Sequence, residues 1–364
     1  MASGQSTAAA HDPLEISAVI DAWITKHETE FSACSQFLFD NPELGMQEHK
    51  ASALLADIAA SHGFSVERGV AGMATAFAAT WGSGSPVLGF SVEYDALPGL
   101  SQQVCAEKKP VAEGGPGHGC GHCALGPGAL QAAMALRYAM EAFSLAGTVR
   151  IFGTPAEEAC VGKAFMARAG IFKGVDCFLD WHPNTDSSFI PKGGNAYFNK
   201  YYHFKGLAAH GNAPWKGRSS LDAAMLMGHA VELLREHIRP GKDGVANTIN
   251  YTFSDVGPEY PGVIPDRSSL WFVGRFTSME ILVDAMERID NCARGSALAT
   301  GTEVHMELVT AIHDKLPNDT LAEVLHAAFL EVGSMPVTEE EQEFAKTMQK
   351  NAGYKAVGVQ QKIS

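Results

Sequence analysis

The sequence predicts an α/β protein in which a domain with a mostly parallel sheet carries a smaller inserted domain. Up to about residue 194, apolar strand segments alternate with helical segments, a pattern that favours a parallel sheet. From about residue 195 the predicted order becomes βαββαβ, which is typical of a ferredoxin-like unit. The 364 residues, 46% hydrophobic and 19% charged, are enough for two globular domains.

The elements of the larger domain follow from apolar spacing and from glycine and proline breaks. Its predicted helices span about residues 14–39, 49–62, 128–143, 319–332 and 338–350, and its predicted strands lie within 86–99, 147–155 and 175–183. We assign residues 12–194 and 312–364 to this domain.

The inserted domain is assigned to residues 195–311. Its predicted strands lie at 196–206, 246–257, 268–276 and 302–310, and its predicted helices at 219–238 and 279–299. The strand segments are rich in aromatic and β-branched residues, while the helical segments repeat apolar residues every three or four positions.

Net charge and cysteine content argue against several classes of protein. A net charge of −14 argues against nucleic acid and anionic membranes as partners. Seven scattered cysteines, an odd number, favour a reducing compartment over a disulfide framework. The N-terminus lacks a signal-peptide pattern, and no window approaches the roughly 18 apolar residues of a membrane helix. We therefore expect a soluble cytoplasmic protein.

Polar side chains follow three of the predicted strands, where ligands bind in open α/β sheets. They are the segment Glu93-Tyr94-Asp95, the pair Glu157-Glu158, and His182. A fourth segment, the glycine-rich loop "GPGHGCGHCALG" at 115–126, lies between the first two and carries Cys120 and His122. Convergence of these four segments at one rim predicts a metal or acid–base site.

The glycine-rich loop allows three interpretations. On an extended loop, His118, Cys120 and His122 alternate and could share one face, and thiolate and imidazole suit zinc. The same residues could stand in a tight loop without function. Cys120 and Cys123 could also form a CxxC-like redox pair, although the surrounding sequence does not read as a thioredoxin-like unit.

The other candidates also have structural alternatives. Glu157 and Glu158 could be a solvated helix start, or one could bind a metal while the other takes a proton from activated water. His182 could be a core histidine or a ligand, and Asp95 a loop cap, a group that orients a ligand, or a bridge between two ions.

Two candidates fall in the inserted domain. His210 could be a plain loop histidine or could stabilise an oxyanion on domain closure. Arg275 could be a solvated cation or could pair with a substrate carboxylate.

Apart from Arg275, these residues lie in segments that resemble the metallo-aminoacylase and carboxypeptidase family of amidohydrolases, peptidase family M20, and most closely its aminobenzoyl-glutamate hydrolase subgroup. The segments are "EYDALPGLSQQ", "GHGCGHCALG", "GTPAEEACVGKAFMARAGIFKGVDCFLDWHP", "AAHGNAPWKGRSSLDA" and "HDKLPN". They cover about residues 35–350 in the family's order and spacing.

The resemblance implies a role for each candidate, in an enzyme that hydrolyses N-acyl amino acids or dipeptides with two divalent ions, zinc or manganese. The implied metal ligands are Cys120, His122, Glu158 and His182, the general base is Glu157, Asp95 supports the ligands, His210 contacts the oxyanion, and Arg275 binds a substrate carboxylate. In this family the inserted domain serves as a lid and dimerisation domain, so a homodimer is expected.

Three departures from the family pattern bear on activity. The family ordinarily continues past the position of Ser364, so the C-terminal part of the larger domain is expected to be incomplete, and the family's last histidine ligand has no counterpart. Gly262 stands where an asparagine is usual. Cys123 replaces another residue, and the loop after His210 is one residue shorter. An alternative function follows, in which a truncated, weakly active or inactive chain acts as a dimerising or regulatory partner.

Overall fold

The computed structural model describes residues 12–184, 187–188, 194–241 and 246–363, which form two compact units. The first unit comprises residues up to Ser187 together with Ser334–Ile363, and the second comprises Ser188–Gly333. Residues 312–333, assigned above to the larger domain, therefore group with the second unit. Within the described part of the chain, no helix is both long and apolar enough to cross a membrane.

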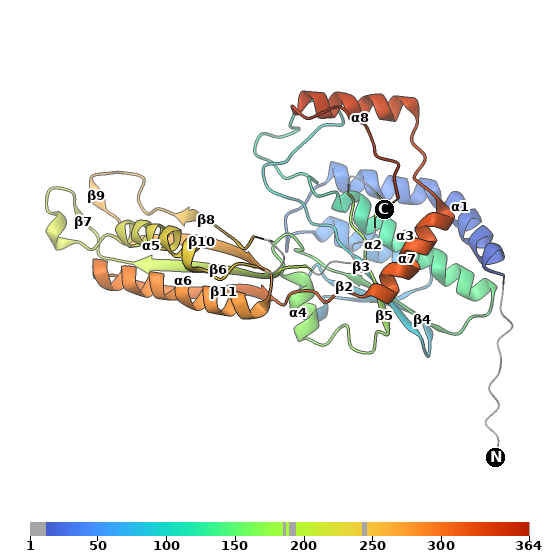
Figure 1. The fold of residues 1–364 in the computed structure, drawn as a ribbon, viewed down its shortest axis with the longest axis horizontal. Coiled ribbons are helices and arrows are strands. Elements are labelled where there is room, and N and C mark those ends of the chain that lie inside the picture. Colours follow the sequence, from blue (N-terminus) through green and yellow to red (C-terminus); the bar gives the residue numbers. More distant parts are fainter. Residues whose placement is uncertain (1–11, 185–186, 189–193, 242–245, 364) are drawn as a thin grey trace, which may run out of the picture. The chain divides into compact units, whose positions relative to one another are not determined.

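The first unit is a five-stranded sheet with helices on both faces (Figure 1). Its elements are α1 (Pro13–Asp40), α2 (His49–Ser61), β1 (Ser65–Arg68), η1 (Val70–Gly72), β2 (Phe77–Ser83), β3 (Val87–Val92), α3 (His122–Ala142), β4 (Gly147–Gly153), α4 (Gly162–Arg168), β5 (Cys177–Leu179) and α8 (Glu339–Asn351). Helices α2 and α3 pack on one face, with α1 against α3, and the buried side chains between them form the main core. A smaller core beneath η1 and α4 covers the other face.

The prediction of a mostly parallel sheet is wrong for half of its pairings. In the order β1-β2-β4-β3-β5, strand β3 is parallel to β4 and β5, but β2 is antiparallel to β4 and β1. Strands β1 and β2 are absent from the prediction, because β1 is short and mostly exposed and shows no apolar pattern. Parallel neighbours need a long crossover connection, whereas a short connection leaves two strands antiparallel. The stretch between β1 and β2 is short, and the two strands pair antiparallel.

Helix α3 begins at His122, earlier than the predicted start at residue 128. The glycines that suggested a loop lie inside the helix because space is short around them. A Cβ at Gly126 would lie 2.4 Å from the backbone oxygen of Glu93, and one at Gly128 would lie 2.8 Å from the Trp181 ring. Glycine thus lets α3 pack directly against the ends of two strand segments.

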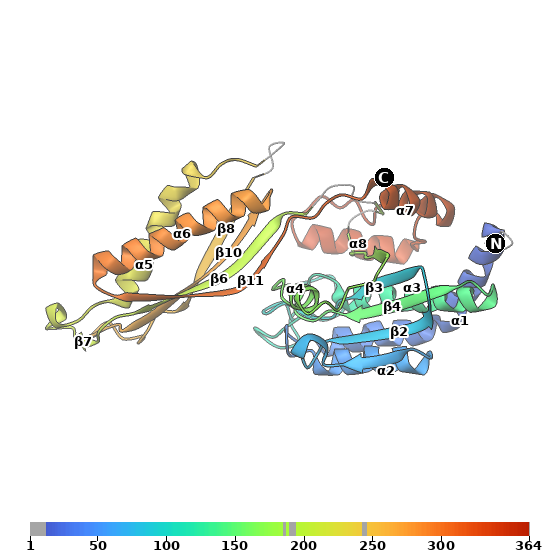
Figure 2. The same ribbon diagram turned by 90° about the horizontal axis from the view of Figure 1, so that it is seen from below.

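The second unit is a four-stranded antiparallel sheet in the order β11-β6-β10-β8, with α5 and α6 on one face (Figure 2). Its elements are β6 (Ala196–Lys205), β7 (Ala209–His210), η2 (Pro214–Lys216), α5 (Ser220–Leu234), η3 (Arg235–His237), β8 (Thr248–Asp255), β9 (Val263–Ile264), β10 (Arg267–Phe276), α6 (Met279–Thr300), β11 (Glu303–Ile312) and α7 (Asp319–Val332). The long strands and two helices follow the βαββαβ order.

Candidate metal centre

Four segments of the first unit bring polar side chains together at one rim of its sheet. Asp95 follows β3, Glu157 and Glu158 follow β4, His182 follows β5, and the Cys120–His122 segment leads into α3. We call the resulting set the rim cluster; it consists of Asp95, Cys120, His122, Glu157, Glu158 and His182.

The His122 ring is held in one orientation by Asp95. Its Nδ1 lies 2.9 Å from Asp95 Oδ1 and 3.0 Å from the Asp95 backbone oxygen. Since both partners only accept hydrogen bonds, Nδ1 carries a proton, and Nε2 points to the remaining space. There it lies 3.3 Å from Glu93 Oε2 and 3.8 Å from Glu157 Oε2. The other Asp95 oxygen accepts the backbone N–H of Glu158 at 3.0 Å, so one buried carboxylate positions two segments.

His122 belongs to two groups of candidate ligand atoms. Cys120 Sγ lies 3.2 Å from His182 Nε2, and these two atoms with a His122 nitrogen lie within 4.8 Å of one another. Glu93, His122 and Glu157 form a second group within the same limit. Thiolate, imidazole and carboxylate together are the ligand types that zinc and neighbouring metals take.

Buried atoms without hydrogen bonds support a cation at the rim cluster and the neighbouring Glu93. Six buried side-chain atoms of the described residues have no hydrogen-bond partner, and three of them lie here: Glu93 Oε2 and His122 Nε2, which are 3.3 Å apart, and Glu158 Oε1. Buried polar groups are normally paired, so three such atoms in one place need an explanation. A divalent metal ion would accept lone pairs from these atoms and offset the surrounding negative charge.

The pKa values of three proposed metal ligands, Cys120, His122 and Glu158, are raised, so these side chains tend to keep their protons when no metal is bound. Burial, together with Glu158, Glu157 and Glu93, raises the pKa of the Cys120 thiol to about 12. Burial alone would lower the pKa of His122, but Asp95 and the other carboxylates raise it to about 9. Burial also raises the pKa of Glu158. A bound cation would reverse these preferences, because it competes with the same protons.

Glu48, which no sequence motif singled out, supports the loop that carries Glu157. Its fully buried carboxylate accepts the backbone N–H of Ala156 at 2.7 Å and the Thr75 hydroxyl at 3.0 Å. Ala156 has left-handed backbone (φ 50°), which a residue with a side chain rarely adopts. No local pattern links positions 48 and 156, so the sequence carries no signal for this contact.

Glu93 and Lys163 are other site residues to which sequence reasoning gave no role. The Lys163 ammonium pairs with Glu93 and lies 3.4 Å from Asp180. Burial opposes charge on Lys163, but Glu93 and Asp180 raise its pKa. Glu93 had a signal, since it stands at a strand end beside Asp95, whereas Lys163 lies in a helix with no distinguishing pattern.

His118 and Cys123 do not follow the expectations for an extended loop. The chain turns at residues 119–120, Gly121 is left-handed (φ 84°) and α3 starts at once, so side chains do not alternate as on a strand. Within the described residues, His118 is in neither group of candidate ligand atoms. Cys123 packs against the main core, and burial raises its pKa, which opposes a reactive redox pair.

His210 and Arg275 lie in the second unit. His210 is exposed on β7, where its Nδ1 accepts the backbone N–H of Asn212 at 3.0 Å. Arg275 is exposed on β10, with its guanidinium 5.3 Å from the centre of the Tyr197 ring. Gly262 lies next to β9, and its backbone oxygen accepts the Gly211 N–H, so the segments that follow His210 and precede β9 are adjacent.

Comparison with known proteins shows the family to which the chain belongs. Residues 89–361 match Peptidase family M20/M25/M40. The chain is 36% identical over 337 residues to a p-aminobenzoyl-glutamate hydrolase component of Escherichia coli K12, covering 92% of this chain and 69% of that protein. It is 31% identical over 314 residues to the Xaa-Arg dipeptidase of Mus musculus, covering 79% of this chain and 65% of that protein. The chain thus spans about two thirds of the length of these relatives.

Two solved structures share the fold. The aminobenzoyl-glutamate utilization protein of Klebsiella pneumoniae has a TM-score of 0.65 at 19% identity, covering 92% of both chains. A dinuclear metal binding peptidase of the M20 family from Bacillus subtilis has a TM-score of 0.54 at 18% identity, covering 93% of this chain and 84% of its own.

Proposed function

Because the chain belongs to peptidase family M20/M25/M40, a family of hydrolases, we propose that it is a metal-dependent amidohydrolase of N-acyl amino acids or dipeptides. The observation that carries the proposal is the rim cluster, in which the buried His122 faces two carboxylates and stands beside the Cys120–His182 pair. The pattern of unpaired buried atoms supports a cation at this place.

In the proposed site Cys120, His122, Glu158 and His182 would hold two divalent ions, zinc or manganese. The chemistry supplied by such ions would be a lowered pKa for a water molecule and polarisation of the amide carbonyl. Asp95 fixes His122 with Nε2 free and holds the Glu158 backbone, so it orients ligands from two segments. The dinuclear metal site named for the Bacillus subtilis structure supports the count of two ions.

We assign the proton transfer to Glu157. Its carboxylate is about a third exposed and lies 3.8 Å from His122 Nε2, so it can face both the cluster and an incoming substrate. As general base it takes a proton from the attacking water and delivers it to the leaving nitrogen. His210 is proposed to stabilise the oxyanion and Arg275 to pair with a substrate carboxylate, roles that the family resemblance suggests.

The relatives point to a substrate with a carboxylate next to the scissile amide. p-Aminobenzoyl-glutamate and Xaa-Arg dipeptides, named for two relatives, both carry a free carboxylate on the amino acid that would be released. A planar guanidinium such as that of Arg275 binds carboxylates with two parallel hydrogen bonds. We propose this carboxylate as the shared recognition element, and a homodimer formed through the second unit as the assembly.

The decisive experiment measures hydrolysis with matched substrates after metal loading. The purified chain is stripped with a chelator, reloaded with zinc or manganese, and assayed with p-aminobenzoyl-glutamate and with the corresponding amide that lacks the α-carboxylate. Metal-dependent release of glutamate that is lost in Glu157→Gln supports the proposal. Turnover that persists without metal, or equal turnover of both substrates, contradicts the metal mechanism or the carboxylate requirement respectively.

A further inference from the structure

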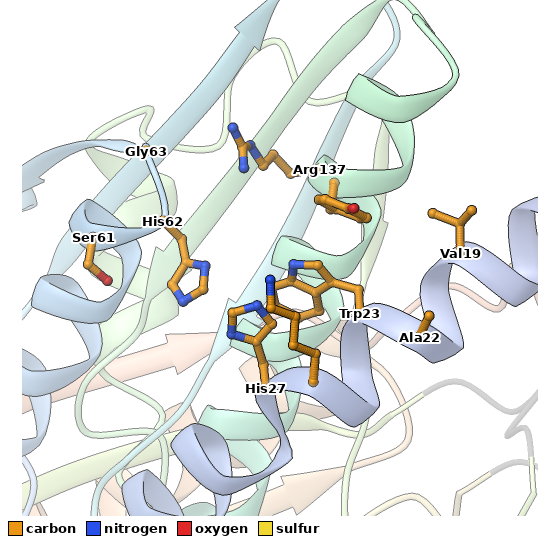
Figure 3. A pocket seen from close by; sticks show the side chains of 10 residues that line it. Val19, Ala22, Trp23, His27, Ser61, His62, Gly63 and Arg137 are labelled. Carbon is orange, nitrogen blue, oxygen red and sulfur yellow. The ribbon is translucent and has the colours of Figure 1, made fainter.

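A second set of metal-type side chains lies between two helices of the first unit. His27 and Glu30 stand one turn apart on α1, and His62 directly follows α2. His27 Nδ1 lies 3.1 Å from one Glu30 oxygen, and His62 Nε2 lies 3.1 Å from both. Figure 3 shows the two imidazoles turned towards one another beside Trp23. We call His27, Glu30 and His62 the helix clasp.

We propose that the helix clasp binds one zinc-class divalent ion, which links α1 to the end of α2 and is separate from the rim cluster. Glu48, at the start of α2, contacts the loop of Glu157, whereas His62 stands at the other end of that helix. Thirteen helical residues at a rise of 1.5 Å each span about 20 Å. An ion in the clasp would therefore share no ligand with the rim cluster.

The chemistry of the clasp is that of zinc sites with three protein ligands. Two imidazoles and one carboxylate, with a fourth position left open, form a recurrent zinc ligand set. A tetrahedral ion with bonds of about 2.0–2.1 Å keeps neighbouring nitrogen and oxygen ligands about 3.3 Å apart. The observed distances of 3.1 Å between the histidine nitrogens and Glu30 are close to this spacing. Only small side-chain shifts separate the present arrangement from a coordinating one.

Packing around Trp23 keeps the ligands in place. The Trp23 ring, 6% exposed, stacks on His27 with centroids 4.4 Å apart, and meets His62 edge-on at 5.7 Å. Phe31 and Tyr138 pack against the same ring. Ligands that are oriented before the metal arrives lose little rotational freedom on binding, which raises affinity.

An adjoining cavity gives the ion access and room for a fourth ligand. The cavity has a volume of about 540 Å³ and is lined by His27 and His62 together with Lys26, Arg137 and Tyr138. Both imidazoles are partly buried, with side chains 23% and 14% exposed, so they are reachable without unfolding. Arg137 is paired with Glu141 at 2.9 Å, and the positive charge of Lys26 favours a negatively charged fourth ligand, such as hydroxide or a small carboxylate.

The proposal is tested by counting zinc bound to the full chain. The wild-type protein and the variants His62→Gln and Glu30→Gln are loaded with zinc alone, freed of excess by gel filtration, and measured by elemental analysis. We expect each variant to hold about one zinc per chain less than the wild type. A matched control, His229→Gln, changes an exposed histidine of α5 and should match the wild type. Equal zinc in wild type and both clasp variants overturns the proposal.

A variant that lacks rim-cluster ligands distinguishes zinc bound at the helix clasp from zinc bound at the rim cluster. In Cys120→Ser combined with His122→Asn and His182→Asn, both candidate groups of the rim cluster lose ligands while the clasp residues are unchanged, so one zinc per chain should remain and should disappear on adding His62→Gln. Circular dichroism of each variant establishes that it is folded. Loss of all zinc in the rim variant itself would show that the clasp does not bind zinc, whatever the result of the hydrolysis assay.

Discussion

The Asp95 carboxylate accepts a hydrogen bond from Nδ1 of His122 at 2.9 Å and thereby sets which nitrogen of that ring is free. The carboxylates of Glu93 and Glu157 approach the other nitrogen, Nε2. A buried carboxylate behind a ligand histidine both orients the ring and makes it a better electron donor. Asp95 thus governs metal binding in the proposed site without being required to touch the ion.

Asp95→Asn should weaken metal binding by about 10–100-fold, because the amide supplies no negative charge and can turn its NH₂ group towards Nδ1. The measurement is a zinc titration in competition with a chromophoric chelator. Asp57→Asn, which removes a carboxylate from an exposed ion pair with Arg68, is the matched control and should leave affinity unchanged. Equal affinities for wild type and Asp95→Asn would remove Asp95 from the metal site.

Glu157→Gln should lower kcat by about 10²–10⁴-fold while the chain keeps its metal, because the amide cannot accept the proton of the attacking water. Glu158→Gln should instead lower metal content, since its side chain is assigned as a ligand. Steady-state kinetics combined with elemental analysis of both variants distinguishes the two roles. The assignment of base and ligand is reversed if Glu157→Gln loses metal and Glu158→Gln retains it.

Zinc binding to the rim cluster should release about two protons per chain near pH 7, one from Cys120 and one from His122. The pKa of Cys120 is raised to about 12 and that of His122 to about 9, so both are protonated there before metal arrives. Affinity should therefore rise with pH across the neutral range and rise less steeply above pH 9. Calorimetry in buffers of different ionisation enthalpy counts the protons. A pH-independent affinity would contradict this picture.

Glu48→Ala should destabilise the protein by about 1–3 kcal/mol, because the N–H of Ala156 and the Thr75 hydroxyl lose a buried acceptor. The displaced loop should also reduce kcat through Glu157. Glu48→Gln keeps an acceptor oxygen and should restore most of both properties. Urea unfolding and kinetics on the two variants make the comparison, and a Glu48→Ala protein as stable as the wild type would show that the contact is unimportant.

Lys163→Met should destabilise the protein, because it leaves the Glu93 carboxylate buried without its cation. Breaking a fully buried pair costs about 3–5 kcal/mol, and the cost here should be lower because Lys163 is about a third exposed. The double variant Lys163→Met/Glu93→Gln should recover stability relative to Lys163→Met alone. Additive losses in the double variant would mean that the two residues do not interact.

Sequence reasoning located the parts of the site that depend on local pattern. Apolar runs mark β3, β4 and β5, and the residues just after each of them meet at one rim. Sequence reasoning did not find β1, whose four residues are mostly exposed, or β2, its antiparallel partner. It also did not find the contact between Glu48 and Ala156, which only the folded chain creates. The side on which His118 lies depends on backbone dihedral angles that spacing does not show: an extended loop was one of the interpretations, whereas a turn precedes α3.

Ala156, the residue before Glu157, has a left-handed backbone that costs stability and fixes the direction of the carboxylates that follow. For a residue with a Cβ this conformation costs about 1–2 kcal/mol, and glycine would adopt it without that cost. Glycine would also let the loop relax, and the carboxylates that follow would lose a fixed direction. Replacing Ala156 with glycine to relieve this strain would remove a buried methyl group and the fixed direction of Glu157, so turnover would fall whatever the change in stability.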